Sequence, residues 1–278
     1  MATQQTDVVR KREVPGYSFF VGSAVFHYLG PSFAVLLFAR VAPLGVAWLR
    51  IATAAAVYAA WRRPWRAFRG APPGARRAIV GMGAVLALMN PCFYVAIDRL
   101  PLATVAAIEF LPVIVLAAAG ARTPRNGAAL VAAVAGVYLL TDVRLGGEPI
   151  GFVFAFLNAG LFSLYIVLAH RVSRQPGISG IDGLAMAMLV ALALVTPIGG
   201  WSAAGALPDP VAVAAGLGVG VTSSVVPYVF DQLAMARMAR STYALFVSLL
   251  PATATVIGIV VLAQVPSAVE LAGVALVV

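Results

Sequence analysis

Long apolar runs separated by short polar gaps decide what this sequence can fold into. The runs lie at residues 17–39, 43–61, 77–97, 101–121, 126–142, 149–170, 181–200, 211–233, 240–263 and from 267 onward. Pro, Gly or Arg bounds each run, as is usual at helix ends. About 20 apolar residues in a helix cross the roughly 30 Å hydrocarbon core of a bilayer. The sequence therefore predicts an all-α integral membrane protein with ten transmembrane helices.

The composition supports lipid as the main solvent. The 278 residues are 62% hydrophobic and 10% charged, whereas an average soluble domain is about half apolar and about a quarter charged. This excludes a soluble enzyme, a disordered chain and a secreted disulfide scaffold. The single cysteine, Cys92, allows no internal disulfide and no cysteine-ligated metal site.

The net charge is +9. Because the basic residues gather in every second gap between the apolar runs, we attribute this charge to the orientation of the chain in the membrane and not to nucleic-acid binding. They are Arg10, Lys11, Arg12, Arg62, Arg63, Arg66, Arg69, Arg76, Arg77, Arg122, Arg125, Arg171, Arg174, Arg237 and Arg240. The alternate gaps hold only Arg40, Arg99 and Arg144. Cytoplasmic loops carry such an excess of Arg and Lys. We expect a bacterial-type inner membrane protein with residues 1–16 as a cytoplasmic tail.

The last run is short. Residues 267–278 would form a helix of about 18 Å, which falls short of a full span. We expect this tenth helix to be truncated relative to the natural protein.

Ten spans divide into two sets of five, at residues 17–143 and 149–278. A repeat with an odd number of spans inserts its second copy upside down. Pro91 and Pro227 occupy corresponding runs, and so do Pro112 and Pro251. Paired prolines predict helix kinks that gate a transport site between inverted repeats, although membrane helices also tolerate proline without such a role.

Two charged residues lie inside the predicted membrane. Arg50 and Glu109 fall at similar depths in the second and fourth runs, and each charge at mid-bilayer costs at least about 2.5 to 3.5 kcal/mol. One interpretation is an ion pair that locks the two helices together. The other is a solute site in which Arg50 faces a carboxylate and Glu109 an ammonium group or a proton.

Further polar residues lie at related depths. His27 is more typical of a packing residue than of a ligand, although it could titrate if water reaches it. Asn90 could serve the backbone beside the Pro91 kink or a ligand, and Ser223 and Ser224 are expected to serve the backbone near Pro227. The predicted solute-binding residues are His27, Arg50, Asn90, Tyr94, Glu109, Asn158, Tyr165 and Tyr228.

Enzyme motifs are missing from the sequence. It has two histidines, no cluster with metal-ligand spacing, no nucleophile elbow and no nucleotide-binding loop. We therefore predict no catalytic residue, no metal and no cofactor.

Several motifs resemble a known family. They are Met89–Tyr94, Leu100–Ala103, Ala107–Phe110, Ser223–Tyr228 and Ala234–Pro251. In order and spacing they resemble the EamA-domain family of the drug/metabolite transporter superfamily, in its threonine/homoserine exporter branch. The resemblance implies ten helices in two inverted halves, cytoplasmic termini and export of small metabolites by alternating access. The branch often has acidic residues where this chain has Leu250 and Gln264.

The predicted function is secondary-active export of amino acids or related small metabolites. Its partners would be a small solute, membrane lipid and protons. Two alternatives remain at this point: the same fold could carry nucleobases, vitamins or drugs, or the chain could be a membrane assembly subunit without a transport role.

Overall fold

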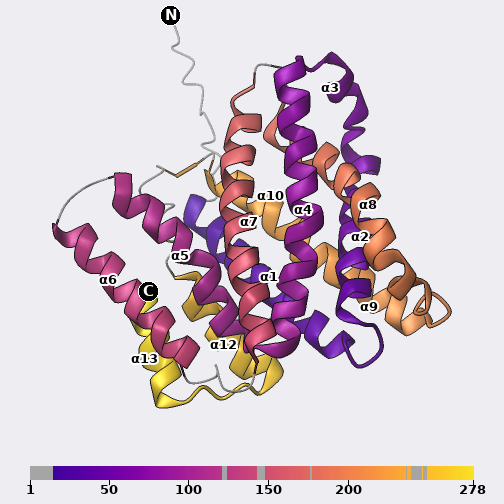
Figure 1. The fold of residues 1–278 in the computed structure, drawn as a ribbon. Helices are drawn as coiled ribbons and strands as arrows, with labels where there is room; N and C mark the ends of the chain where they lie inside the picture. The colour runs from indigo at the N-terminus through magenta and orange to yellow at the C-terminus, as the bar shows by residue number, and fades with distance from the viewer. Residues whose placement is uncertain are drawn as a thin grey trace, which may run out of the picture.

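The computed structural model describes residues 15–120, 124–142, 148–175, 177–235, 237–238, 246 and 249–278. Within these ranges every regular element is a helix (Figure 1). The helices are α1 (Gly16–Leu37), α2 (Pro43–Arg62), α3 (Trp65–Gly70), α4 (Pro73–Arg99), α5 (Leu102–Gly120), α6 (Pro124–Asp142), α7 (Pro149–Ser173), α8 (Gly180–Ala204), α9 (Pro210–Gly220), η1 (Val221–Val225), α10 (Val226–Met235), α12 (Leu250–Leu262) and α13 (Ala268–Val277). The predicted tail lies almost entirely outside the described residues.

Six described helices are long and apolar enough to cross a membrane. They are α1, α2, α4, α7, α8 and the continuous segment Pro210–Asp231. Shorter apolar helices cover Leu102–Pro112, Gly127–Leu139, Leu250–Leu262 and Ala268–Val277. The prediction of an all-helical membrane protein is confirmed, and each of the ten predicted runs contains a helix.

The basic gap between the second and third predicted runs differs from the prediction. The sequence indicates a loop up to residue 76, but the structure has the short helix α3 there, and α4 begins at Pro73. Pro fits the first turn of a helix because the N–H that it lacks would be unpaired there anyway. α3 has no buried residue, so it produces no apolar run that a sequence pattern could reveal.

Each long helix packs on more than one other, and α4, for example, packs on both α7 and α8. α2 packs on α8, α4 on α7, α5 on α12 and α6 on α13, while α1 packs along α9, η1 and α10. Small residues let the backbones approach closely, as is usual for membrane helices. A Cβ atom on Gly199 would lie 2.4 Å from the Leu44 carbonyl oxygen, and one on Gly136 would lie 2.5 Å from that of Gly273.

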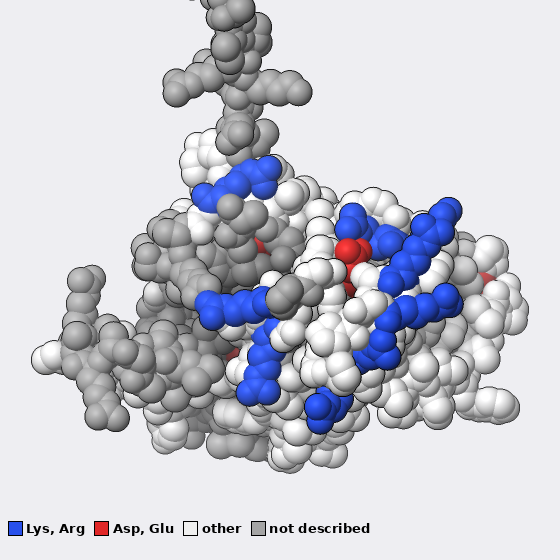
Figure 2. Space-filling view, turned by 90° about the horizontal axis from the view of Figure 1, so that it is seen from above, with Lys and Arg blue, Asp and Glu red and all other residues white. Residues whose placement is uncertain are grey.

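Basic residues gather at the α3 end of the bundle (Figure 2). In the described chain they are Arg62, Arg63, Arg66, Arg69, Arg76, Arg77, Arg171, Arg174 and Arg237. Arg62 donates two hydrogen bonds to the Asp182 carboxylate, at 2.8 and 3.2 Å, and so ties α2 to α8 at this end. The predicted basic residues Arg10, Lys11, Arg12, Arg122 and Arg240 lie outside the described residues, as does Arg144.

The opposite end carries few basic residues. Arg40 pairs with Asp209 at 2.9 Å, and Arg99 lies 3.8 Å from Glu148. Asp209 also accepts hydrogen bonds from the N–H groups of Val211 and Ala212 at the start of α9. The Ala212 N–H and the Arg40 guanidinium hold the pKa of the Asp209 carboxyl below its usual range.

Candidate functional site

Arg50 is buried in the middle of the bundle, on α2, and it contacts the π-helical turn η1. Its Nε donates to Ser224 Oγ at 2.7 Å and its Nη2 to the Ser223 carbonyl oxygen at 3.0 Å. Pro227 explains why that carbonyl is available, because a proline removes the N–H that would bond the carbonyl four residues earlier. A buried arginine thus supplies the hydrogen bond that the helix cannot make for itself.

Glu109 on α5 is also buried, with 4% of its surface exposed. Its Oε1 accepts a hydrogen bond from Asn158 Nδ2 on α7 at 3.0 Å. Glu109 and Arg50 interact electrostatically, but the salt bridges of the described residues do not include this pair. The ion pair, which is one of the two interpretations of the sequence, is therefore not formed here: Arg50 bonds Ser223 and Ser224, and Glu109 bonds Asn158.

Aromatic side chains border these two charges. The Tyr94 ring on α4 has its centroid 5.6 Å from Arg50 Cζ. Tyr165 on α7 and Tyr228 on α10 have ring centroids 6.2 Å apart. The hydroxyl of Tyr58, on α2, donates to the carbonyl oxygens of Ser224 and Val225. The aromatic groups therefore connect α2, α4, α7 and α10 around the charges.

His27 and Asn90 lie at the edge of this group. The half-buried His27 has its ring centroid 5.3 Å from that of Tyr28, and it interacts electrostatically with Arg50. Asn90 Nδ2 donates to the Leu86 carbonyl oxygen at 2.8 Å. Asn90 thus serves the backbone next to Pro91, which is one of the two roles that the sequence leaves open.

Five buried side-chain atoms in the described residues have no hydrogen-bond partner. They are Tyr28 Oη, Tyr94 Oη, Glu109 Oε2, Asn158 Oδ1 and Ser223 Oγ. They come from α1, α4, α5, α7 and η1. Ser223 and Tyr94 contact Arg50, and Asn158 bonds Glu109. Tyr28 interacts electrostatically with Glu109. An unpaired buried polar atom costs about 1–3 kcal/mol. We call Tyr28, Arg50, Tyr94, Glu109, Asn158 and Ser223 the central site.

The structure links seven of the eight predicted solute-binding residues by contacts or electrostatic interactions, whereas Asn90 bonds the backbone of its own helix. It also adds residues that the sequence does not single out. Ser224 accepts from Arg50 through its side chain, whereas we predicted a backbone role for it. Tyr28 and Tyr58 carry no sequence signal, because isolated tyrosines are common in membrane helices. Among the described residues, no group of His, Cys, Asp and Glu could hold a metal ion.

The four prolines predicted as kinks have different places. Pro91 and Pro112 lie inside α4 and α5, and Pro227 lies where η1 meets α10. Pro251 lies in the first turn of α12, and most of the predicted run before it, from residue 240, lies outside the described residues, so its role as a kink stays a prediction.

Known proteins are similar to this chain over most of its length. The chain is 29% identical over 245 residues to the threonine/homoserine exporter RhtA of Escherichia coli (strain K12), covering 87% of this chain and 81% of the relative. It is 30% identical over 238 residues to the threonine/homoserine exporter RhtA of Salmonella typhimurium (strain LT2), covering 84% of this chain and 79% of the relative. A scan against sequence models of known protein families finds no match.

Proposed function

The chain belongs to the EamA family of the drug/metabolite transporter superfamily, and from this premise we propose that it exports a small amino acid of the threonine or homoserine kind by alternating access. Its relatives are named as exporters, and its long apolar helices are those of a multi-pass membrane protein. The proposal adds the substrate class, the mechanism and the residues that carry it.

The packing of the helices supports two inverted five-helix repeats, at residues 17–143 and 149–278. An inverted repeat exchanges the first helix of one half with the first of the other, and so on through the fifth. That exchange maps the pairs α2–α8, α5–α12 and α6–α13 onto themselves. It maps α4–α7 onto the contact of α1 with α9, η1 and α10, which also exists. Alternating access then follows as rocking of one half against the other.

The observation that carries the proposal is the set of unpaired polar atoms beside two opposite charges. An amino acid presents a carboxylate and an ammonium group, and Arg50 and Glu109 complement the two. Glu109 Oε2 and Asn158 Oδ1 would accept hydrogen bonds from the ammonium group. Because each unpaired atom costs about 1–3 kcal/mol, a solute that satisfies them gains that free energy on binding.

Arg50 would couple the solute to the motion. The solute carboxylate would compete with Ser223 and Ser224 for the guanidinium, which now holds η1 against α2. Release of these contacts would free η1 and α10 to move relative to α2. When the ammonium group leaves, a proton would take its place on Glu109, which would give proton coupling.

We test this with protein reconstituted into liposomes, by counterflow of radiolabelled L-threonine and L-homoserine. Glu109→Gln and Arg50→Ala should each lower the rate about 10- to 100-fold, because a hydrogen bond to a charged group contributes about 1.5–3 kcal/mol. Glu148→Gln and Arg40→Ala make the same changes on side chains at the end of the bundle opposite α3, and they should transport like the wild type.

Two outcomes would contradict the proposal. Wild-type protein that moves neither amino acid has a different cargo or no transport activity. Full transport by both Glu109→Gln and Arg50→Ala would reduce the central site to a structural contact between helices. Folding is checked separately by size-exclusion chromatography in detergent.

A further inference from the structure

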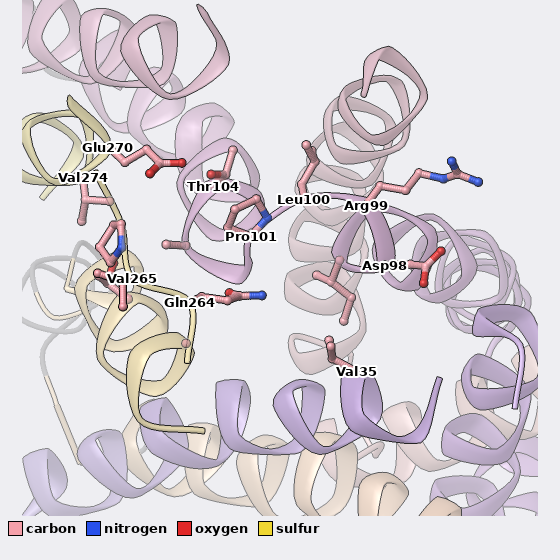
Figure 3. A pocket seen from close by; sticks show the side chains of 15 residues that line it. Val35, Asp98, Arg99, Leu100, Pro101, Thr104, Gln264, Val265, Glu270 and Val274 are labelled. Atoms are coloured by element: carbon pink, nitrogen blue, oxygen red, sulfur yellow. The ribbon is translucent and has the colours of Figure 1, made fainter. Parts of the chain in front are cut away.

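A pocket of about 270 Å³ lies at the end of the bundle opposite α3, away from the central site. α1, α4, α5, α12 and α13 surround it (Figure 3). The connections at Arg99–Pro101 and Gln264–Pro266 form its rim, so we call it the loop pocket. Its volume lies just below the roughly 300–1,000 Å³ typical of pockets for drug-sized ligands, which suits a smaller metabolite.

One wall of the loop pocket is the N-terminus of α5, where backbone N–H groups have no partner one turn earlier in the helix. The Leu102 N–H is taken by Gln264 Oε1, at 3.1 Å. Ala103 and Thr104, next along the helix, line the pocket. Helix N-termini favour carboxylates because their N–H groups and dipole attract negative charge. Gln264 therefore places an amide oxygen where a carboxylate oxygen of a ligand would fit.

The Thr104 side chain adds a second, independent sign of a ligand. It is 1% exposed, and the hydrogen bonds of the described residues do not include its hydroxyl. Figure 3 shows this hydroxyl pointing into the pocket. Thr255 on α12, by contrast, donates its hydroxyl to the Pro251 carbonyl oxygen. Of the two threonines that line the pocket, Thr104 is thus the one whose hydroxyl can donate a hydrogen bond to a ligand.

The facing wall carries a carboxylate. Glu270 on α13 is buried, with 5% exposed, and it points across the pocket toward Thr104 (Figure 3). The Ser267 N–H donates to its Oε2 at 2.7 Å, which fixes the side chain in the first turn of α13. Arg99 extends away from Thr104 and Glu270 (Figure 3). The pocket therefore has amide donors on one side and the Glu270 carboxylate on the other.

We propose that the loop pocket is a second binding site for an α-amino acid, occupied on the release side of the transport path. The carboxylate binds the α5 N-terminus and the Thr104 hydroxyl, displacing the Gln264 side chain, and the ammonium group binds Glu270. Thr104 precedes Glu109 by five residues on α5, which is about 7.5 Å along the helix, so one helix carries both sites. This inference rests on the proposed function, because it requires an amino-acid cargo.

The test is saturation binding of radiolabelled L-threonine and of L-homoserine to purified protein in detergent. Wild type should bind two equivalents of the cargo. Thr104→Val removes only the hydroxyl, and Glu270→Gln keeps a side chain that can still complete the capping box with Ser267. The double variant should bind one equivalent, which further substitution of Glu109→Gln should abolish. Thr253→Val on α12 removes a hydroxyl that bonds Leu249 and lies outside the pocket lining, and it should keep two equivalents.

Each outcome decides between the two proposals. One equivalent in the wild type, lost in Glu109→Gln but retained by the double variant, would overturn the loop pocket and leave the proposed function standing. Two equivalents in both wild type and double variant would also overturn it. If the wild type binds neither amino acid, the proposed function fails and this inference fails with it.

Discussion

Gly30 on α1 sets the distance between that helix and the π-helical turn η1. A Cβ atom at this position would lie 2.1 Å from Ser223 Oγ and 2.7 Å from the Ser223 backbone nitrogen. Neither distance is compatible with van der Waals contact, and one of the two atoms belongs to the backbone. Gly30 therefore allows the close approach that brings Ser223 beside Arg50.

Gly30→Ala should destabilise the protein by about 1–3 kcal/mol, because overpacking a tight contact forces the two backbones apart. It should also lower transport, because Ser223 and Arg50 move with η1. Thermal unfolding in detergent micelles measures the first effect. Gly160→Ala on α7 is the matched control, because a Cβ atom there meets nothing within 4 Å. Equal unfolding temperatures for the two variants would show that α1 and η1 are not tightly packed.

Arg50 also shows where inference from sequence stops. Its depth in the membrane, and that of Glu109, follow from counting residues at about 1.5 Å each along a helix. The partners that Arg50 takes do not follow, because Ser223 and Ser224 lie more than 170 residues away. They accept from Arg50 only because η1 and Pro227 leave acceptors available. Two charges at similar depths leave both an ion pair and a solute site open, whereas the packed structure gives Arg50 and Glu109 separate neutral partners.

At the scale of one element, the segment α9–η1–α10 combines a π-helical turn with a proline. π-helical turns inside helices occur frequently at functional sites, and this one contacts α1 and α2. Ser23 on α1 also donates to the Pro227 carbonyl oxygen and to Asp231. The backbone of this segment is therefore held by side chains of α1 and α2, which would release it when they bind something else.

Pro227→Ala should slow transport while leaving stability equal or higher. The new N–H can bond a carbonyl of the preceding turn and so compete with Arg50 for Ser223. We expect about a tenfold loss in counterflow rate, the equivalent of one hydrogen bond of about 1.4 kcal/mol. Pro197→Ala on α8 is the control, because that proline also lies inside a helix but outside the central site. Wild-type counterflow by Pro227→Ala would mean that the proline has no role in the motion.

At the scale of the whole molecule, the sequence predicts where the helices lie because the solvent is lipid. Every backbone N–H and C=O group in the hydrocarbon must be paired within the protein, so the apolar runs must become helices. The runs therefore locate the described helices except α3, which has no fully buried residue. Their pairing follows from small residues such as Gly136 and Gly199, which contact other helices. Which helix each of these glycines contacts depends on how the helices are rotated about their axes, and a hydropathy pattern does not predict that rotation.

Orientation is a property of the whole molecule and decides which way the loop pocket opens. The arginines of the α3 end favour the cytoplasm by the positive-inside rule, so we expect Arg40, Asp209 and the loop pocket to lie outside. Single cysteines in a Cys92→Ala background test this with a membrane-impermeant maleimide on intact cells. Gly205→Cys, at the end opposite α3, should react at once. Gly74→Cys, in the exposed first turn of α4, should react only after permeabilisation. The reverse pattern would place the loop pocket in the cytoplasm, and it would then be an entry site and not a release site for an exported solute.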